Sequence, residues 1–301
     1  MVSRRFVTGA LMLGGGSVVV GGPAALLWWP KDSKPSPDQM VARRIVASVL
    51  NHQGKDGGLL SSDPAYNLSL SALLLKVSVG LGLDPSVLKG GERSLSDYFE
   101  DHPSSGVPSR EVQDSILRYE VAQALGKETT PYLVQLLAMI EAKLNAETRN
   151  PVRRSDEDSL AWRYYALRVM RDAKISSQVG LYQRLEAGVI QLFNQDTGEW
   201  REFLQGGDPR GVNDLAVIAY EAEVERAQTS QSIQDSNNSL GFWVGEKVSL
   251  GTMAEYSRVF PHDRVRRDQM KELYLSGPAQ NRSNSSQILL THLQVAQALS
   301  F

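Results

Sequence analysis

The chain has 301 residues, of which 42% are apolar and 22% charged, so it can bury one large core or two small ones. Its 32 Lys and Arg residues nearly balance its 34 Asp and Glu residues, which excludes the overall basic field typical of nucleic-acid binding. The absence of cysteine excludes disulfides, thiolate zinc sites and cysteine nucleophiles.

The first thirty residues have the pattern of a targeting or anchoring segment. Arg4 and Arg5 precede an uncharged run at 6–29, which as a helix would reach about 36 Å and cross a hydrocarbon core of about 30 Å. Trp28 and Trp29 suit a membrane interface, and the two arginines favour a body outside the cytoplasm. We predict a membrane anchor at 1–30, which contacts the membrane through 6–29, and a Pro-rich tether at 31–37.

A cleaved signal is the alternative for this segment. Residues 3–7, Ser-Arg-Arg-Phe-Val, resemble a twin-arginine export signal, although the Phe comes one residue early. Cleavage would leave an exported, soluble protein. Either reading predicts that the main domain, 38–301, lies on the periplasmic or extracellular face.

Beyond the tether the sequence is helical in pattern, and strand signals are scarce. The second helix of each predicted pair is the more apolar one, which predicts an all-α fold with the second helices inside and the first helices outside. The six predicted pairs are 38–52 with 66–81, 93–101 with 109–125, 130–147 with 156–173, 181–194 with 213–226, 229–237 with 249–259, and 264–275 with 284–299.

Glycine-rich turns join the members of several pairs. Residues 56–60 read Asp-Gly-Gly-Leu-Leu, residues 195–200 read Gln-Asp-Thr-Gly-Glu-Trp, and residues 239–243, Ser-Leu-Gly-Phe-Trp, are a fainter copy. These turns resemble the turn repeats of the terpenoid cyclase and protein prenyltransferase superfamily. The resemblance implies an α/α toroid of about six helical hairpins over 38–301. A superhelical array of the tetratricopeptide kind is the structural rival.

The resemblance implies a site in the mouth of the toroid, but the residues that carry the known chemistries are missing. Prenyltransferases hold zinc with Asp, Cys and His, whereas this chain has no Cys and has Asn67, Ser69 and Ser71 in the region where the His would stand. The nearest match to the acidic motif of class II cyclases, Asp-Glu-Asp-Ser at 156–159, also suits a helix cap. The four histidines are far apart in sequence, so we predict no metal and no cofactor.

Carboxylates, aromatic residues and arginines remain at the predicted entrances of the inner helices. Two carboxylates roughly 5–10 Å apart can act as acid and base on a glycosidic bond. The predicted catalytic residues are Asp158 and Asp214. The predicted ligand-binding residues are Asp63, Tyr66, Glu111, Trp162, Arg163, Arg210, Trp243 and Glu246. For the tryptophans, which could stack on sugar rings, packing against the core is the alternative.

Three functions fit these residues. The first is a membrane-tethered module outside the cytoplasm that binds or scaffolds an envelope protein or glycan. The second is a glycoside hydrolase or polysaccharide lyase that uses paired carboxylates, an analogy drawn from the fold. The third is a terpenoid-cyclase-like enzyme, which requires a deep apolar central cavity. The side chains that line the centre of the toroid would distinguish these three functions.

Overall fold

The computed structural model describes most of the N-terminal half and the C-terminal helices. The described residues are 35–89, 92–102, 104–106, 111–149, nine residues between 162 and 175, 179–190, 193–194, 199–200, 250–259, 261–277 and 285–300. They are mostly helical, which confirms the predicted all-α class. The β-structure among them is one antiparallel pair of two-residue strands and an isolated bridge.

The helices begin and end close to the predicted positions. In chain order the α-helices are α1 (Pro37–Val49), α2 (Asn67–Gly80), α3 (Leu95–Asp101), α4 (Glu111–Ala124), α5 (Thr130–Arg149), α7 (Val179–Ile190), α10 (Leu250–Val259), α11 (Arg264–Ser276) and α12 (Ser286–Leu299). Short 3-10 turns η2 (Leu50–His52) and η3 (Pro64–Tyr66) precede α2, and the strands are β1 (Phe193–Asn194) and β2 (Glu199–Trp200). The predicted helices at 213–226 and 229–237 lie outside the described residues.

Local caps explain these boundaries. Ser36 and Gln39 form a reciprocal capping box at the start of α1, and Pro37 occupies its first turn, where no backbone donor is needed. After the C-terminal end of α2, Gly82 has φ +68°, and its N–H donates to the carbonyl oxygen of Val79 at 2.9 Å. A residue with a side chain is strained in that conformation, so the helix ends where the glycine allows the chain to turn.

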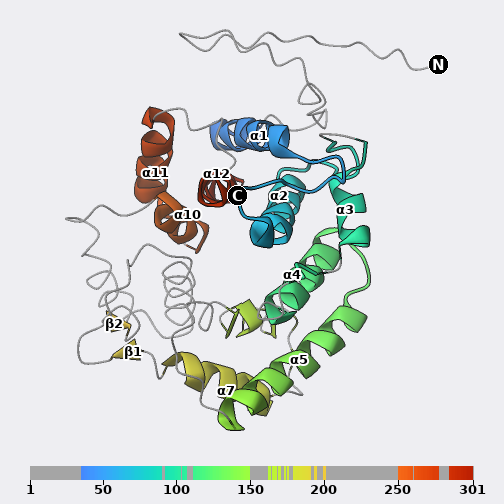
Figure 1. The fold of residues 1–301 in the computed structure, drawn as a ribbon. Coiled ribbons are helices and arrows are strands. Elements are labelled where there is room, and N and C mark those ends of the chain that lie inside the picture. The colour runs from blue at the N-terminus through green and yellow to red at the C-terminus, as the bar shows by residue number, and fades with distance from the viewer. Residues whose placement is uncertain are drawn as a thin grey trace.

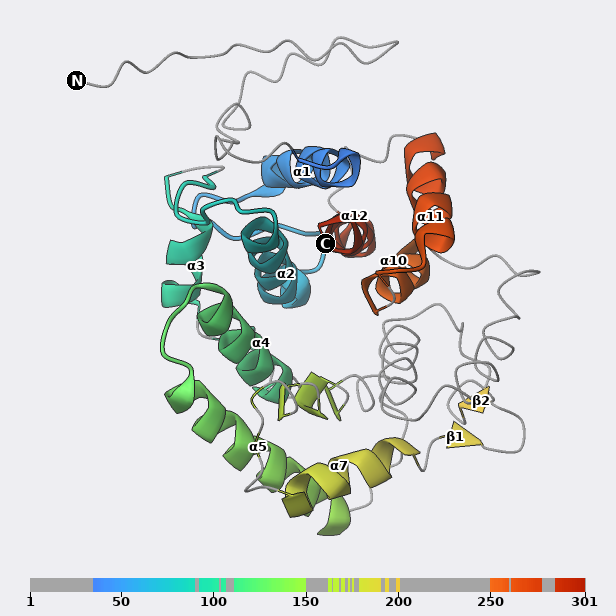
Figure 2. The same ribbon diagram turned by 180° about the vertical axis from the view of Figure 1, so that it is seen from behind.

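Neighbouring helices form one continuous row. Along it α10 packs against α12, α12 against α2, and α2 against α4. Helices α11, α1, α3 and α5 flank this row on its outer side, as Figures 1 and 2 show from opposite directions. The row therefore consists of the second members of the predicted pairs, and the flanking helices are the first members.

The two ends of the described domain share a core. Buried side chains of α1, α2, α10 and α12 form one hydrophobic cluster, which includes Val46, Leu74 and Leu293. A second cluster joins α4, α5 and α7 with residues 162–170. Because α12 packs against both α1 and α2, the first and last helical pairs of the domain are in direct contact.

No helix within the described residues is both long enough and apolar enough to cross a membrane. The predicted anchor at 1–30 lies outside those residues.

Candidate functional site

The glycine-rich turn at 53–60 is tightly built. The Gln53 side-chain amide donates to the carbonyl oxygens of Gly57 and Leu88, and Asp56 Oδ1 accepts from the Gly58 N–H at 3.1 Å. Gly57 has φ +93°, and a Cβ there would lie 2.1 Å from the Ser94 carbonyl oxygen. This position therefore requires glycine for both its conformation and its close approach to the start of α3.

Gly58 is needed for a different reason. Its φ is not positive, but a Cβ there would lie 2.3 Å from the ring of Tyr98 on α3. That ring stacks on His102 with centroids 4.4 Å apart, and His102 Nε2 lies 3.8 Å from Asp56 Oδ2. Burial, with the negative charge of Asp56, raises the pKa of Tyr98 to about 12. Tyr98 and His102 thus support the turn, and the Tyr98 hydroxyl stays neutral.

Asp63 and Tyr66 lie where the chain enters α2. Asp63 caps η3, since its Oδ1 accepts from the Ala65 N–H at 3.0 Å, and its own N–H donates to Ser286 Oγ at 3.2 Å. Ser286, in the first turn of α12, also donates from Oγ to Ser61 Oγ at 3.0 Å. Tyr66 packs partly against the core. The entrances of α2 and α12, which are neighbours in the row, are therefore joined by hydroxyl and backbone hydrogen bonds.

The entrance of α4 carries Glu111 and Asp114. Glu111 is exposed in the first turn of the helix, where a carboxylate complements the helix dipole. Asp114 is buried, and its Oδ2 accepts from both the N–H and the hydroxyl of Ser105 at 2.8 Å. Asp114 therefore holds residues 104–106 against α4.

Trp162 and Arg163 lie beside each other at the second core cluster. Trp162 is fully buried among side chains of α4 and α5, and Lys143 Nζ lies 4.7 Å from its ring centroid. The guanidinium carbon of Arg163 lies 5.6 Å from the same centroid. These contacts correspond to the core-packing alternative for the tryptophan, with cations over its ring. The other predicted site residues, Asp158, Arg210, Asp214, Trp243 and Glu246, lie outside the described residues.

A polar stripe that the sequence analysis did not single out runs along α2 and α4. Half-buried residues recur at 69, 73 and 76 on α2 and at 113, 117 and 120 on α4, each set following one helix face. The stripes meet where Lys76 Nζ contacts Glu120 Oε2 at 2.7 Å, with side chains 22% and 10% exposed. We call Ser69, Leu73, Lys76, Gln113, Leu117 and Glu120 the α2–α4 stripe.

Within the described part of the chain, buried amide oxygens without a partner occur on α4, within the stripe, and on α12. Gln113 Oε1 on α4 and Gln294 Oε1 on α12 are buried and have no hydrogen-bond partner among the described residues. A buried acceptor without a donor costs about 1–3 kcal/mol. One sequence signal could have pointed here, because Lys76 is the one charged residue of α2.

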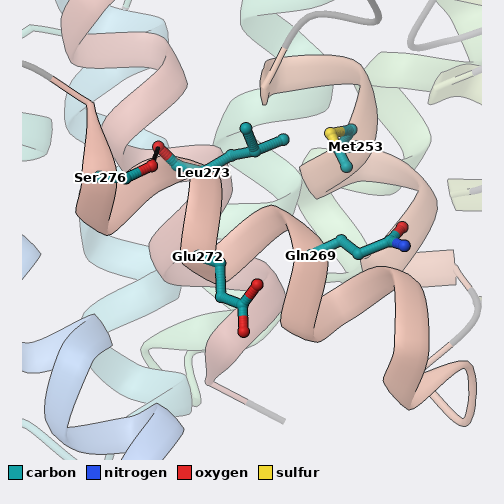
Figure 3. A pocket seen from close by; sticks show the side chains of 5 residues that line it. All are labelled: Met253, Gln269, Glu272, Leu273 and Ser276. Carbon is teal, nitrogen blue, oxygen red and sulfur yellow. Dashed lines mark hydrogen bonds between the residues drawn. The ribbon is translucent and has the colours of Figure 1, made fainter.

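A shallow groove lies between α10 and α11. Figure 3 shows Met253 of α10 facing Gln269, Glu272, Leu273 and Ser276 of α11 around a space of about 410 Å³. It holds a single carboxylate. Within the described residues, no three His, Asp or Glu side chains come together in a way that could hold a metal ion.

Comparisons with known proteins identify no relative: no family model, curated protein or solved structure matches this chain.

Proposed function

We propose that residues 38–301 form an α/α toroid that binds an envelope protein or glycan, and that residues 1–30 tether this module to a membrane. Contact between the first and last helical pairs supports a ring over an open superhelix, because the ends of a superhelical array lie apart. In a ring, the row α10, α12, α2 and α4 would be the inner layer, and the α2–α4 stripe would face the centre.

The single observation that carries the binding proposal is the α2–α4 stripe itself. A helix buried on all sides would carry apolar residues all round, yet the half-buried faces of α2 and α4 combine the polar residues Ser69, Lys76, Gln113 and Glu120 with Leu73 and Leu117. Amide, hydroxyl and charged groups on such a face suit hydrogen bonds to a polar ligand. They do not suit the apolar cavity that terpenoid chemistry would need.

The described carboxylates at the helix entrances support binding over catalysis. Asp63 caps η3 and Asp114 holds residues 104–106, so both already have structural partners. A glycosidase needs two carboxylates that converge on one bond. Glu111 remains exposed at the entrance of α4, and the predicted catalytic pair of the enzymatic alternative is Asp158 and Asp214.

Site-specific photo-crosslinking in intact cells tests this function. A photoreactive side chain at Ser69, on the stripe, should capture one discrete protein or saccharide species, identified by mass spectrometry. Ser96, also half-buried but on the flanking helix α3, is the matched control. Equal capture from both positions, or none from Ser69, would refute a binding surface on the stripe. Turnover of a captured saccharide that is lost in Asp158→Asn and Asp214→Asn would favour the enzyme instead.

A further inference from the structure

The accessible surface of α1 follows directly after the tether. Met40 is 44% exposed and Arg44 is exposed, while Val41, Ala47 and Ser48 are half-buried. The one acidic residue of α1, Asp38, is buried. The accessible side of α1 therefore presents apolar groups and a cation, and no carboxylate.

Asp38 fixes α11 beside this surface. Its carboxylate accepts from Arg267 Nη2 at 2.9 Å and from Lys271 Nζ at 2.7 Å. Leu275 lies one helical turn after Lys271 and is 60% exposed. Met40 and Leu275 are thus exposed apolar side chains on two helices that a half-buried ion pair joins.

The length of the tether limits how far this surface can lie from a membrane. Residues 30–36 follow the apolar run 6–29 and span at most about 25 Å when fully extended. A compact domain of the length of 38–301 is about 45 Å across. Because the tether is shorter than the domain, the start of α1 must lie on the side of the domain nearest the bilayer.

We propose that the outer surface of α1 and the C-terminal end of α11 rest on the headgroup layer of an anionic bilayer, with Met40 and Leu275 inserted at its edge. The proposal rests on the membrane tether of the proposed function. Arg44 is exposed on α1, and the sequence carries Lys31 and Lys34 in the tether just before this helix; anionic headgroups attract such cations. This contact would hold the domain in one orientation, so that the same side of the ring always faces away from the membrane.

Depth-dependent quenching tests the contact. The chain has no cysteine, so single substitutions Met40→Cys and Leu275→Cys carry one environment-sensitive fluorophore each. Val134→Cys on α5 is the matched control, because Val134 is 64% exposed and Figures 1 and 2 show α5 on the far side of the described helices from α1. The full-length proteins are placed in vesicles of phosphatidylcholine and phosphatidylglycerol in equal parts, with a nitroxide near the headgroup.

Probes at 40 and 275 should be quenched several-fold more strongly than the probe at 134, and Met40→Glu should reduce quenching at 275. Equal quenching at all three sites, in protein that stays on the vesicles after a carbonate wash, would overturn the surface contact and leave the tether intact. Release of the protein by that wash would overturn the tether and, with it, this proposal.

Discussion

Replacing Gly57 with alanine should destabilise the domain more than any ordinary surface change. A side chain at φ +93° costs roughly 1–2 kcal/mol in backbone strain. The new Cβ would also lie 2.1 Å from the Ser94 carbonyl oxygen, so the backbone at 93–94 must move by about 1 Å. Ser94 is the N-cap of α3, in a capping box with Asp97, and a lost cap costs about 0.5–2 kcal/mol. The expected total is roughly 2–4 kcal/mol.

Thermal unfolding of the full-length protein in detergent, followed by circular dichroism, measures this cost. For a domain of this size, 1 kcal/mol corresponds to roughly 2–4 °C in Tm, so Gly57→Ala should lower Tm by roughly 4–16 °C. Gly126→Ala is the matched control, because Gly126 has φ +65° but no atom lies within 4 Å of its added Cβ. The control should lose only the strain term. If the two variants melted together, close packing of the turn against α3 would be refuted.

Two further predictions concern buried and half-buried charges. Lys76→Met should lower the free energy of unfolding by about 1–3 kcal/mol, because Glu120 loses its ion-pair partner. The double variant Lys76→Met with Glu120→Leu should recover most of that loss, as measured by denaturant titration of the wild type and both variants. If the effects of the two substitutions simply added in the double variant, the pairing would be contradicted. Burial, and to a smaller extent the charge of His52, holds the pKa of His292 below its usual 6.5. Near this pH the folded state therefore binds fewer protons than the unfolded chain. The free energy of unfolding consequently falls as the pH is lowered from about 6.5 through the lowered pKa. His292→Asn should therefore flatten the dependence of Tm on pH below about 6.5, and an unchanged slope would contradict this.

Helix positions could be predicted because their causes are local. The apolar spacing in 66–81 and the glycines that follow it are visible in the sequence, and α2 extends over Asn67–Gly80. The last helix was predicted at 284–299 and extends over Ser286–Leu299. Gly126 follows α4 in the sequence, and its φ of +65° is the conformation that a helix stop needs. Gly57 likewise has the positive φ that its turn requires.

The candidate surface depends on contacts between distant residues, which a single sequence does not contain. Lys76 and Glu120 are separated by 44 positions and meet because α2 and α4 pack side by side. The role of Asp114 depends in the same way on Ser105, which folds back over α4. A residue at a predicted helix entrance therefore cannot be assigned to a ligand or to a cap until its partner is placed.

The central claim is that the α2–α4 stripe binds a polar ligand, and reversing its ion pair tests this most directly. Lys76→Glu with Glu120→Lys keeps the contact between the two side chains but exchanges the charges that a ligand would meet. Affinity is measured, for the wild-type and reversed proteins, toward the species that the Ser69 probe captures. The account predicts an unchanged Tm and a loss of affinity of at least about tenfold, or about 1.4 kcal/mol. Equal affinity in a reversed protein that melts with the wild type would contradict it.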